Sequence, residues 1–288
     1  MHKKFLLSFL ISCVFIGANA QFDGAYASYK QDGEFGAAIG LDHYFGDLNT
    51  NASLSHPKFS AGIYFLKQFN NYVGVKVAGT YAFLAYADKY SNNEAQKIRN
   101  LSFNTDIWEF SISGVFNFFK FVPSEPGYRF TPYISLGAGV FSYDPYAYLN
   151  GTKYFLRPLG TEGQGSSEYP NRKPYGSMAV CFPLAVGVKQ AITDKMNVFA
   201  EIGYRFTTTD YIDDVSTTYA GATAFPPLPN GQPSVAYQLQ DRSGQIVATP
   251  IGIAGRQRGN SSQNDAYVIF HVGLSFNLSS YKCPTATQ

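Results

Sequence analysis

Apolar and polar side chains alternate along several long stretches of the chain, most regularly near its C-terminal end. Between Ala266 and Leu278, the apolar residues from Val268 to Leu278 occupy every second position, and the residues between them are mostly small or polar. Successive side chains of a β-strand point to opposite faces, so this pattern predicts a strand with one apolar face. No charged residue interrupts that face.

Seven further segments show the same alternation, which predicts an antiparallel sheet of about eight strands. The expected strands are residues 34–45, 59–68, 72–86, 103–118, 130–142, 176–192, 197–208 and 266–278. Pro183 has an inward-facing position in one of them. Because proline cannot donate a ladder hydrogen bond, we expect a β-bulge there.

The connections between these segments alternate between long and short. Asn70-Asn71 and Thr193-Asp194 are tight turns, whereas the long connections are residues 46–57, 87–102, 143–174 and 209–264. Outer-membrane barrels combine short periplasmic turns with long extracellular loops, and every strand edge in lipid must be paired. The predicted fold is therefore all-β: a transmembrane antiparallel up-and-down β-barrel of about eight strands, with both termini in the periplasm.

A secreted β-sandwich or lipocalin-like barrel is the alternative, and its outward positions would carry Lys and Glu. Here the outward positions hold almost none, with Lys67 as the exception near a strand end. Aromatic residues cluster at both predicted rims, as in the interfacial girdles of membrane barrels. They are Tyr72, Phe118, Tyr128 and Phe130 at the periplasmic rim, and Tyr44, Tyr86, Trp108 and Tyr143 at the outer rim.

The N-terminus predicts export. Lys3 and Lys4 precede the apolar residues 5–17, and Ala18-Asn19-Ala20 is a signal-peptidase site, so residues 1–20 are expected to be a cleaved signal peptide. A lipoprotein box ending at Cys13 is the alternative. Residues 21–33 then form a periplasmic N-terminal segment, residues 34–278 the barrel, and residues 279–288 a periplasmic tail. No other segment has the ~18 apolar residues of a membrane helix.

Composition agrees with a membrane barrel. Aromatic residues make up 17% of the chain and charged residues only 15%, against a typical ~25% in soluble domains. Of the 22 Lys and Arg residues, two lie in the signal peptide, and the remaining 20 balance the 20 Asp and Glu residues. No basic excess is left that would favour nucleic acid as a partner.

Charged and titratable residues gather at the inward positions. An eight-stranded barrel is only wide enough for side chains to fill its interior, and an unpaired buried charge is costly. We therefore expect a lumen network of ion pairs, with a conducting channel as the alternative. Its members are Asp42, Lys76, Glu109, Lys189, Glu201, Arg205 and His271.

No catalytic residue, metal ligand or cofactor is assigned. His43 and His56 lie near the outer rim without an obvious serine partner, and Asp42 and His271 both face inward although they are possible neighbours across the closing seam. A lipid hydrolase at the rim is therefore a minor alternative. The acids Asp210, Asp213 and Asp214 suggest calcium only weakly, because their spacing is not that of an EF-hand loop.

The mature chain has two cysteines, Cys181 on a strand and Cys283 in the tail. Cys181 is expected ~25 Å along the barrel from the periplasmic end, where Cys283 lies. A disulfide needs Cα atoms within ~7 Å, so the two cysteines are too far apart to pair. Cys283 is then an odd thiol in an oxidising compartment. It is a candidate for an intermolecular disulfide, with a reduced thiol as the alternative.

Two resemblances sharpen this picture. His271, Gly273, Phe276 and Leu278 resemble the C-terminal insertion signal of outer-membrane barrels, which implies the barrel-assembly machinery as a partner during insertion. The segment after the seventh strand resembles the hallmark of the PorG-type family of Bacteroidota outer-membrane proteins. Its matching residues are Thr209, Asp210, Tyr211, Asp213, Asp214, Val215 and Ser216.

The PorG-type resemblance covers nearly the whole mature chain, with further matching pieces at residues 34–36, 43–49 and 281–284, although residues 220–264 are longer than expected. It implies a non-enzymatic component of the type IX secretion system that anchors or organises a periplasmic ring of the PorK lipoprotein and PorN. The expected contact segments are residues 22–33, 119–129 and 279–288. A small porin-like or ligand-binding barrel is the alternative function.

Overall fold

The computed structural model describes residues 29–281 and the side chains of residues 32–278. The compact unit Gln31–Leu278 contains the barrel and its loops, and the remaining residues form a second unit. Most of that second unit lies outside the described residues. The expected signal peptide, most of the N-terminal segment and the tail residues Cys283 and Pro284 therefore also lie outside them.

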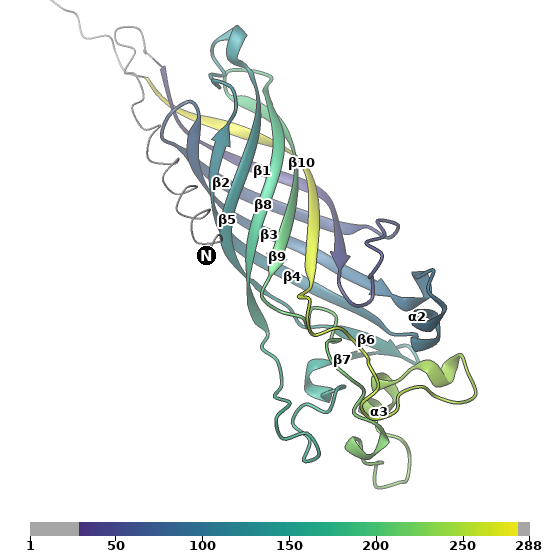
Figure 1. Ribbon diagram of the computed structural model, residues 1–288. Coiled ribbons are helices and arrows are strands. Elements are labelled where there is room, and N and C mark those ends of the chain that lie inside the picture. The colour runs from purple at the N-terminus through teal and green to yellow at the C-terminus, as the bar shows by residue number, and fades with distance from the viewer. Residues whose placement is uncertain (1–28, 282–288) are drawn as a thin grey trace, which may run out of the picture. The chain divides into compact units, whose positions relative to one another are not determined.

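Eight long antiparallel strands form a closed barrel (Figure 1). Each strand pairs with the next along the chain, and β10 pairs with β1, so that the wall has no free edge. The barrel strands are β1 (Tyr29–Phe45), β2 (Lys58–Gln68), β3 (Val73–Ala87), β4 (Ser102–Asn117), β5 (Phe130–Ser142), β8 (Met178–Ala191), β9 (Met196–Thr207) and β10 (Ala266–Tyr281). The predicted up-and-down barrel is confirmed.

The long connections all leave one end of the barrel, and they fold together into what we call the loop-end lobe: residues 46–57, 88–101, 143–177 and 208–265. The lobe contains a short hairpin and two short helices that the sequence pattern did not predict. These are β6 (Tyr146–Leu149), β7 (Thr152–Phe155), α2 (Glu94–Arg99) and α3 (Val235–Gln240), and four 3-10 turns accompany them: η1 (Asp88–Tyr90), η3 (Arg157–Leu159), η4 (Ala222–Ala224) and η5 (Ser243–Gln245).

The opposite end, the turn end, holds the connections 69–72, 118–129 and 192–195, with η2 (Pro126–Tyr128) in the second of them. Both helices of the lobe have side-chain caps. Asn93 accepts a hydrogen bond from Ala95 N at the start of α2, and Ser234 accepts one from Tyr237 N at the start of α3. No helix among the described residues is long and apolar enough to cross a membrane.

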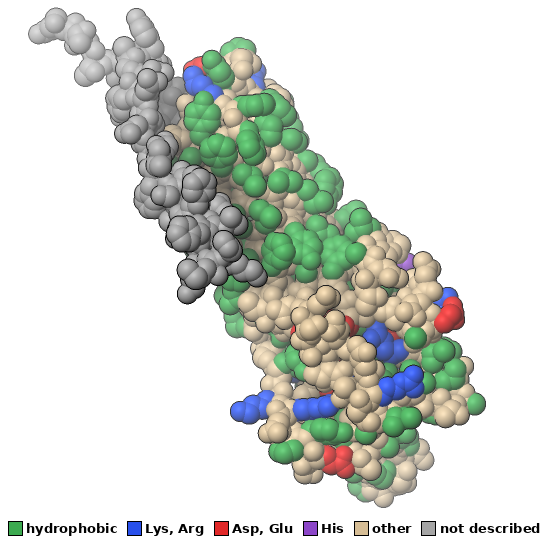
Figure 2. All heavy atoms as spheres, viewed as in Figure 1, with side chains coloured by type: hydrophobic (Ala, Val, Ile, Leu, Met, Phe, Trp, Pro, Cys, Tyr) green, Lys and Arg blue, Asp and Glu red, His purple; other side chains and the backbone are tan. Residues whose placement is uncertain are grey.

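The outer wall of the barrel is covered by apolar side chains, which we call the apolar belt. Ile39 and Trp108 are each 65% exposed, and all eight strands contribute similar residues. Figure 2 shows the hydrophobic side chains spread over the barrel wall, with the charged side chains at its two ends. A contiguous apolar surface of this extent is rare on proteins that face water. It is the surface expected of a barrel surrounded by lipid.

The expected aromatic girdle is confirmed at the turn end, where Tyr72, Phe118, Tyr128 and Phe130 are exposed. At the loop end the prediction is right for Trp108 and wrong for three residues. Tyr44, Tyr86 and Tyr143 are buried beneath the lobe. Tyr44 and Tyr86 have the parity of the inward positions on their strands, so they point into the barrel and not toward lipid.

Glycines allow the first and last strands to approach closely. A Cβ at Gly273 would lie 2.3 Å from the carbonyl oxygen of Ala37 and 2.7 Å from the ring of Phe199, and one at Gly40 would lie 1.8 Å from the carbonyl oxygen of Phe270. Gly273, a residue of the expected insertion signal, therefore allows β10 to pack closely against β1 at the seam between the first and last strands. His271 of that signal is buried inside the barrel, whereas Phe276 and Leu278 are exposed in the apolar belt.

Pro183 does not produce the expected bulge. The β5–β8 register is the same on both sides of it, from Leu136↔Leu184 to Gly139↔Cys181, and only the pairing at the two positions between is missing. On its other side Pro183 remains in register with Arg205 of β9. The missing N–H therefore interrupts one ladder locally without adding a residue.

A Cβ at the seam should impair barrel closure. We expect Gly273→Ala to lower the yield of the compact, heat-resistant form on a gel, because β1 or the Phe199 ring must move. Gly79→Ala is the matched control, since a Cβ at Gly79 has nothing within 4 Å. Equal yields for the two variants would show that the seam tolerates a wider spacing.

Candidate functional site in the lumen and the loop-end lobe

The barrel interior is lined by polar and charged side chains from all sides. The structure places all seven residues of the expected charge network inside it, six of them buried and Lys76 partly exposed to the cavity. Five of them, Lys76, Lys189, Glu201, Arg205 and His271, line one small cavity. The network residues are arranged in successive layers along the barrel, each with its own ion pair or hydrogen bonds.

The layer nearest the turn end contains Lys189 and Glu34, whose Nζ and Oε1 atoms lie 2.5 Å apart. Tyr64 OH also donates to Glu34 Oε1 at 2.7 Å. Phe121, from the connection 118–129, is buried with its ring 5.4 Å from Lys189 Nζ. This ring lies beside the ion pair where that connection meets the turn end. Sequence reasoning missed Glu34, although it has the same inward parity as Asp42.

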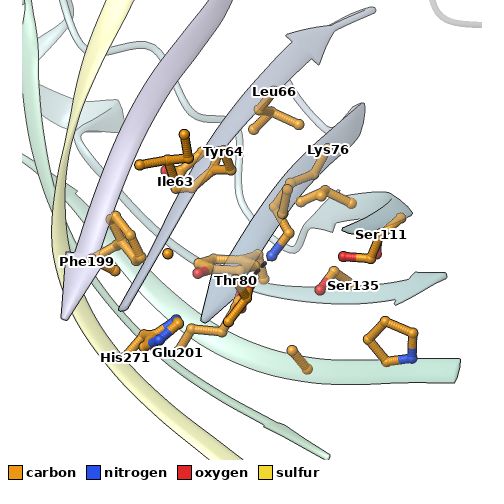
Figure 3. A pocket seen from close by; sticks show the side chains of 18 of the residues that line it. Ile63, Tyr64, Leu66, Lys76, Thr80, Ser111, Ser135, Phe199, Glu201 and His271 are labelled. Carbon is orange, nitrogen blue, oxygen red and sulfur yellow. Dashed lines mark hydrogen bonds and ion pairs between the residues drawn. The ribbon is translucent and has the colours of Figure 1, made fainter. Parts of the chain in front are cut away.

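The middle layer pairs Lys76 with Glu201 at 2.7 Å, and His271 lies opposite Glu201 in the β9–β10 register. Around them is a cavity of about 40 Å³, lined also by Thr80, Ser111 and Ser135 (Figure 3). A water molecule needs ~10–15 Å³ on this scale, so the cavity has room for about three waters. That is space for a small hydrated pocket and not for a continuous pore.

The layer toward the loop end joins Arg205 to Glu109 at 3.3 Å. Tyr267 OH donates to the same Glu109 carboxylate at 2.8 Å. Asp42 accepts a hydrogen bond from Phe83 N at 3.1 Å. Asp42 and His271 thus have different neighbours, and the arrangement does not form a catalytic pair.

Apolar side chains fill the barrel beyond this layer. They continue into the lobe as one cluster of buried residues, which includes Leu84, Phe103, Ile107, Phe141 and Ile269. Cys181 belongs to the same cluster as a buried free thiol. Within the described residues, the loop end of the lumen is therefore occupied by packed apolar side chains.

The segment Thr209–Ser216, which carries the PorG-type resemblance, folds over this apolar cluster. Tyr44 OH bridges two acids, donating to Asp213 Oδ2 at 2.5 Å and lying 3.0 Å from Asp265 Oδ1. Asp213 also accepts a hydrogen bond from Val215 N at 2.9 Å, as in an Asx turn. The segment thus ties the end of β9 to the end of β1 across the mouth of the barrel.

A second set of buried charges holds the lobe together. Arg258 contacts Glu162 at 3.1 Å and Asp214 at 3.6 Å, and Tyr175 OH donates to Asp214 at 2.6 Å. Glu162 in turn accepts from the backbone N–H groups of Ser216 and Thr217. Sequence reasoning missed Glu162 and Arg258, because they lie in connections without hydrophobic periodicity.

Burial shifts the titration of the acids in the lobe. It raises the pKa of Asp210 to about 7, with Asp47 and Glu162 adding to the shift, and it raises the pKa of Asp214 to about 6 against the opposing effect of Arg258. Burial and the mutual repulsion of Asp213 and Asp265 raise the pKa of Asp213 well above its usual value. These acids therefore bind protons more tightly in the folded lobe than they would in water.

The histidines and acids of the described residues were expected to include neither a metal site nor a catalytic set. Within residues 29–281 no group of three or more His, Cys, Asp or Glu side chains is arranged to hold a metal ion. His56 does contact Ser55, with Nδ1 and Oγ 2.8 Å apart. Its ring stacks on Tyr90 at 3.6 Å, and no acid orients it in the described part of the chain.

The fold and the lumen together define a small membrane-type β-barrel with an apolar exterior and a packed interior. The chain belongs to the family described as "Domain of unknown function (DUF6089)", whose sequence profile matches residues 20–221. No curated protein sequence matches the chain.

Several solved structures are similar to the chain at low sequence identity. The neisserial surface protein A is 12% identical, with a TM-score of 0.41 and coverage of 87% of this chain and 99% of that chain. Ail, the attachment invasion locus protein of Yersinia pestis, is 9% identical, with a TM-score of 0.39 and coverage of 86% and 99%. OprG from Pseudomonas aeruginosa is 8% identical, with a TM-score of 0.36 and coverage of 87% and 98%.

Breaking the turn-end ion pair should destabilise the barrel strongly. Lys189→Met leaves Glu34 buried without its cation, and we expect a loss of ~3–5 kcal/mol in the free energy of unfolding. The double variant Glu34→Gln/Lys189→Met should recover most of this loss. Urea unfolding in detergent, followed by the fluorescence of Trp108, the only tryptophan, measures it.

Arg129→Gln is the control for this comparison, because its ion pair with Asp194 at 2.8 Å lies at the surface, with Arg129 partly exposed and Asp194 exposed. Its loss should cost no more than ~1 kcal/mol. A Lys189→Met barrel as stable as the Arg129→Gln barrel would contradict the structural role of the lumen pair.

The lobe should be more stable in mild acid than in base. An acid whose pKa is raised on folding stabilises the fold fully below its unfolded pKa near 3.8, and this contribution is lost as the pH rises through 6 to 7. We expect hydrogen exchange of residues 208–265, corrected for intrinsic rates, to show more protection at pH 5 than at pH 8. Asp210→Asn should reduce this difference; an unchanged pH dependence would exclude Asp210 as a source.

Proposed function

We propose that this protein is an outer-membrane β-barrel that acts as a non-enzymatic scaffold within the type IX protein secretion machinery. The observation that carries the scaffold role is the filled lumen. Ion pairs occupy its turn-end and middle layers, apolar side chains occupy its loop end, and the cavity between them has room for only about three waters. The working parts of such a barrel are its surfaces.

The apolar belt supports placement in a membrane, and the expected export signal supports the outer membrane of a bacterium. Strands that span lipid must have all their backbone groups paired, which the closed wall provides apart from the short interruption at Pro183. In this placement the loop-end lobe faces outward. The turn end and both termini then face the periplasm.

The assignment to type IX secretion is supported by the resemblance of the segment Thr209–Ser216 to the PorG-type family. In the structure this segment is buried in the lobe, so we assign it the task of shaping the outer end of the barrel and not of contacting a periplasmic partner. The surface that would hold the ring of the PorK lipoprotein and PorN is at the turn end.

At the turn end, the connection 118–129 forms an ordered platform beside the short turn 192–195. Arg129 joins the two through its ion pair with Asp194 and also donates to the carbonyl oxygen of Pro123 at 3.0 Å. Lys120 lies 4.3 Å above the Tyr128 ring and 3.6 Å from Glu125. This fixed arrangement of exposed charges is suited to docking a folded periplasmic protein.

The alternative functions are less well supported by the geometry. A small porin-like barrel needs a continuous water path, and the packed loop end opposes one. A lipid hydrolase at the rim needs an acid to orient a histidine beside a serine, and His56 lacks that acid in the described residues.

Charge reversal on the platform should weaken ring recovery. We expect Glu125→Lys, expressed in a deletion strain, to lower co-purification of PorK and PorN by about tenfold and to reduce secretion. The new lysine repels its neighbour Lys120 and removes an acid from the surface proposed to meet the ring. Glu168→Lys, an exposed acid in the lobe, is the matched control and should leave both unchanged.

The same purified barrel in a planar bilayer should show no conductance above background. Intact secretion in the deletion strain, with no PorK or PorN recovered on the wild-type barrel, would end the scaffold proposal. A stable open conductance would instead favour the porin-like alternative.

A further inference from the structure

The hairpin β6–β7 extends the barrel wall at the loop end by pairing with β4 above the apolar belt. Tyr146 of β6 pairs with Asn104 of β4, four residues beyond Trp108 on the same strand. At ~3.3 Å per residue and a tilt of ~40°, this places the hairpin ~10 Å outside the tryptophan along the barrel axis. A bilayer has its headgroup layer at this level, just beyond the interfacial aromatic ring.

The two faces of the hairpin differ in chemistry. On one face Ala147 and Leu149 are buried in the apolar cluster of the lobe, and Tyr154 packs against it, so the hairpin is held rigidly. The opposite face, which we call the hairpin face, consists of Tyr146, Tyr148, Lys153 and Phe155. Tyr148 and Phe155 are 50% and 45% exposed, and Lys153 is exposed between them.

Lys153 is surrounded by aromatic rings and has no ion-pair partner among the described residues. Its Nζ lies 3.5 Å from the centroid of the Tyr146 ring and 4.8 Å from that of Phe155. Tyr148 is directly opposite Lys153 in the hairpin register. Rings hold the ammonium in place without neutralising it, so its charge remains available to an anion.

The hairpin face continues the outer face of β4 outward from the belt. Below it, Tyr81 and Trp108 pack with their rings 4.9 Å apart, and Tyr81 OH donates to Asp106 at 2.6 Å. Outward from the belt, apolar residues give way to aromatic residues, Lys153 and the acid Asp106, whose carboxylate accepts the Tyr81 hydroxyl. This change follows the change from acyl chains to headgroups. A folded partner protein would not need this continuity with the belt, whereas a lipid does.

We propose that the hairpin face binds the headgroup of an anionic glycolipid of the outer leaflet, with Tyr148 and Phe155 against the sugar rings and Lys153 on a phosphate. This rests on the outer-membrane placement of the proposed function, but not on the role in secretion. The aromatic side chains supply rigid contact area, and the lysine supplies attraction to the phosphate. Bound lipid would fix the orientation of the lobe relative to the membrane surface.

The test measures lipid retention by native mass spectrometry of the full barrel in detergent, with bisphosphorylated lipid A or its dephosphorylated form added. Lys153→Gln should lower retention of the phosphorylated lipid by about fivefold, the effect of one basic group near an anionic surface. It should leave the dephosphorylated lipid unaffected. Tyr148→Ser should lower retention of both lipids.

Lys173→Gln is the matched control, because Lys173 is an exposed lysine in the same connection and makes no ring contact among the described residues. It should bind like the wild type, and heat resistance on a gel shows that all variants fold. Equal retention of the phosphorylated lipid by Lys153→Gln and wild type, or equal retention of both lipids by wild type, overturns the proposal. A wild-type barrel that does not insert into bilayers at all would instead overturn the proposed function.

Discussion

Closure of the wall between β1 and β10 is the constraint on which the remaining structure depends. A strand edge left open in lipid would expose unpaired N–H and C=O groups, each costing several kcal/mol. Closing an eight-stranded wall also fixes a narrow interior, so every inward side chain must fit beside those of the facing strands. Glycine at positions 40 and 273 is the local solution, because backbone and ring atoms already occupy the space of a side chain there.

The narrow interior in turn determines how charge is handled. Taking an isolated ion out of water is far more costly than taking out a pair, and three lumen acids, Glu34, Glu109 and Glu201, are each paired with a cation. Separation of the pairs into layers keeps like charges apart along the barrel. Hydroxyl groups of Tyr64 and Tyr267 satisfy further carboxylate lone pairs, which lowers the cost of burying Glu34 and Glu109. The side chains that fill such a barrel stabilise it. They also leave no room for a channel through the interior.

The strands were predictable from the sequence because only one face of each strand meets apolar surroundings. Apolar and polar residues therefore alternate with a period of two. Strand limits therefore agree to within a few residues, and β5 (Phe130–Ser142) agrees at both ends. Parity alone would also have found Glu34 and would have excluded Tyr44 and Tyr86 from the lipid-facing girdle. What parity cannot supply is the lobe. Pairs such as Glu162 with Arg258 join connections far apart in the sequence, and no periodicity relates them.

The lobe and the barrel differ in how their buried acids are neutralised. In the lumen, Glu34, Glu109 and Glu201 are each paired with a cation. In the lobe, Asp213 and Asp265 share one phenol and lie near further acids, so protons and not cations balance part of their charge. The charge of the lobe thus depends on pH through its buried acids. The barrel, with its paired wall and its lumen ion pairs, separates the lobe from the turn end.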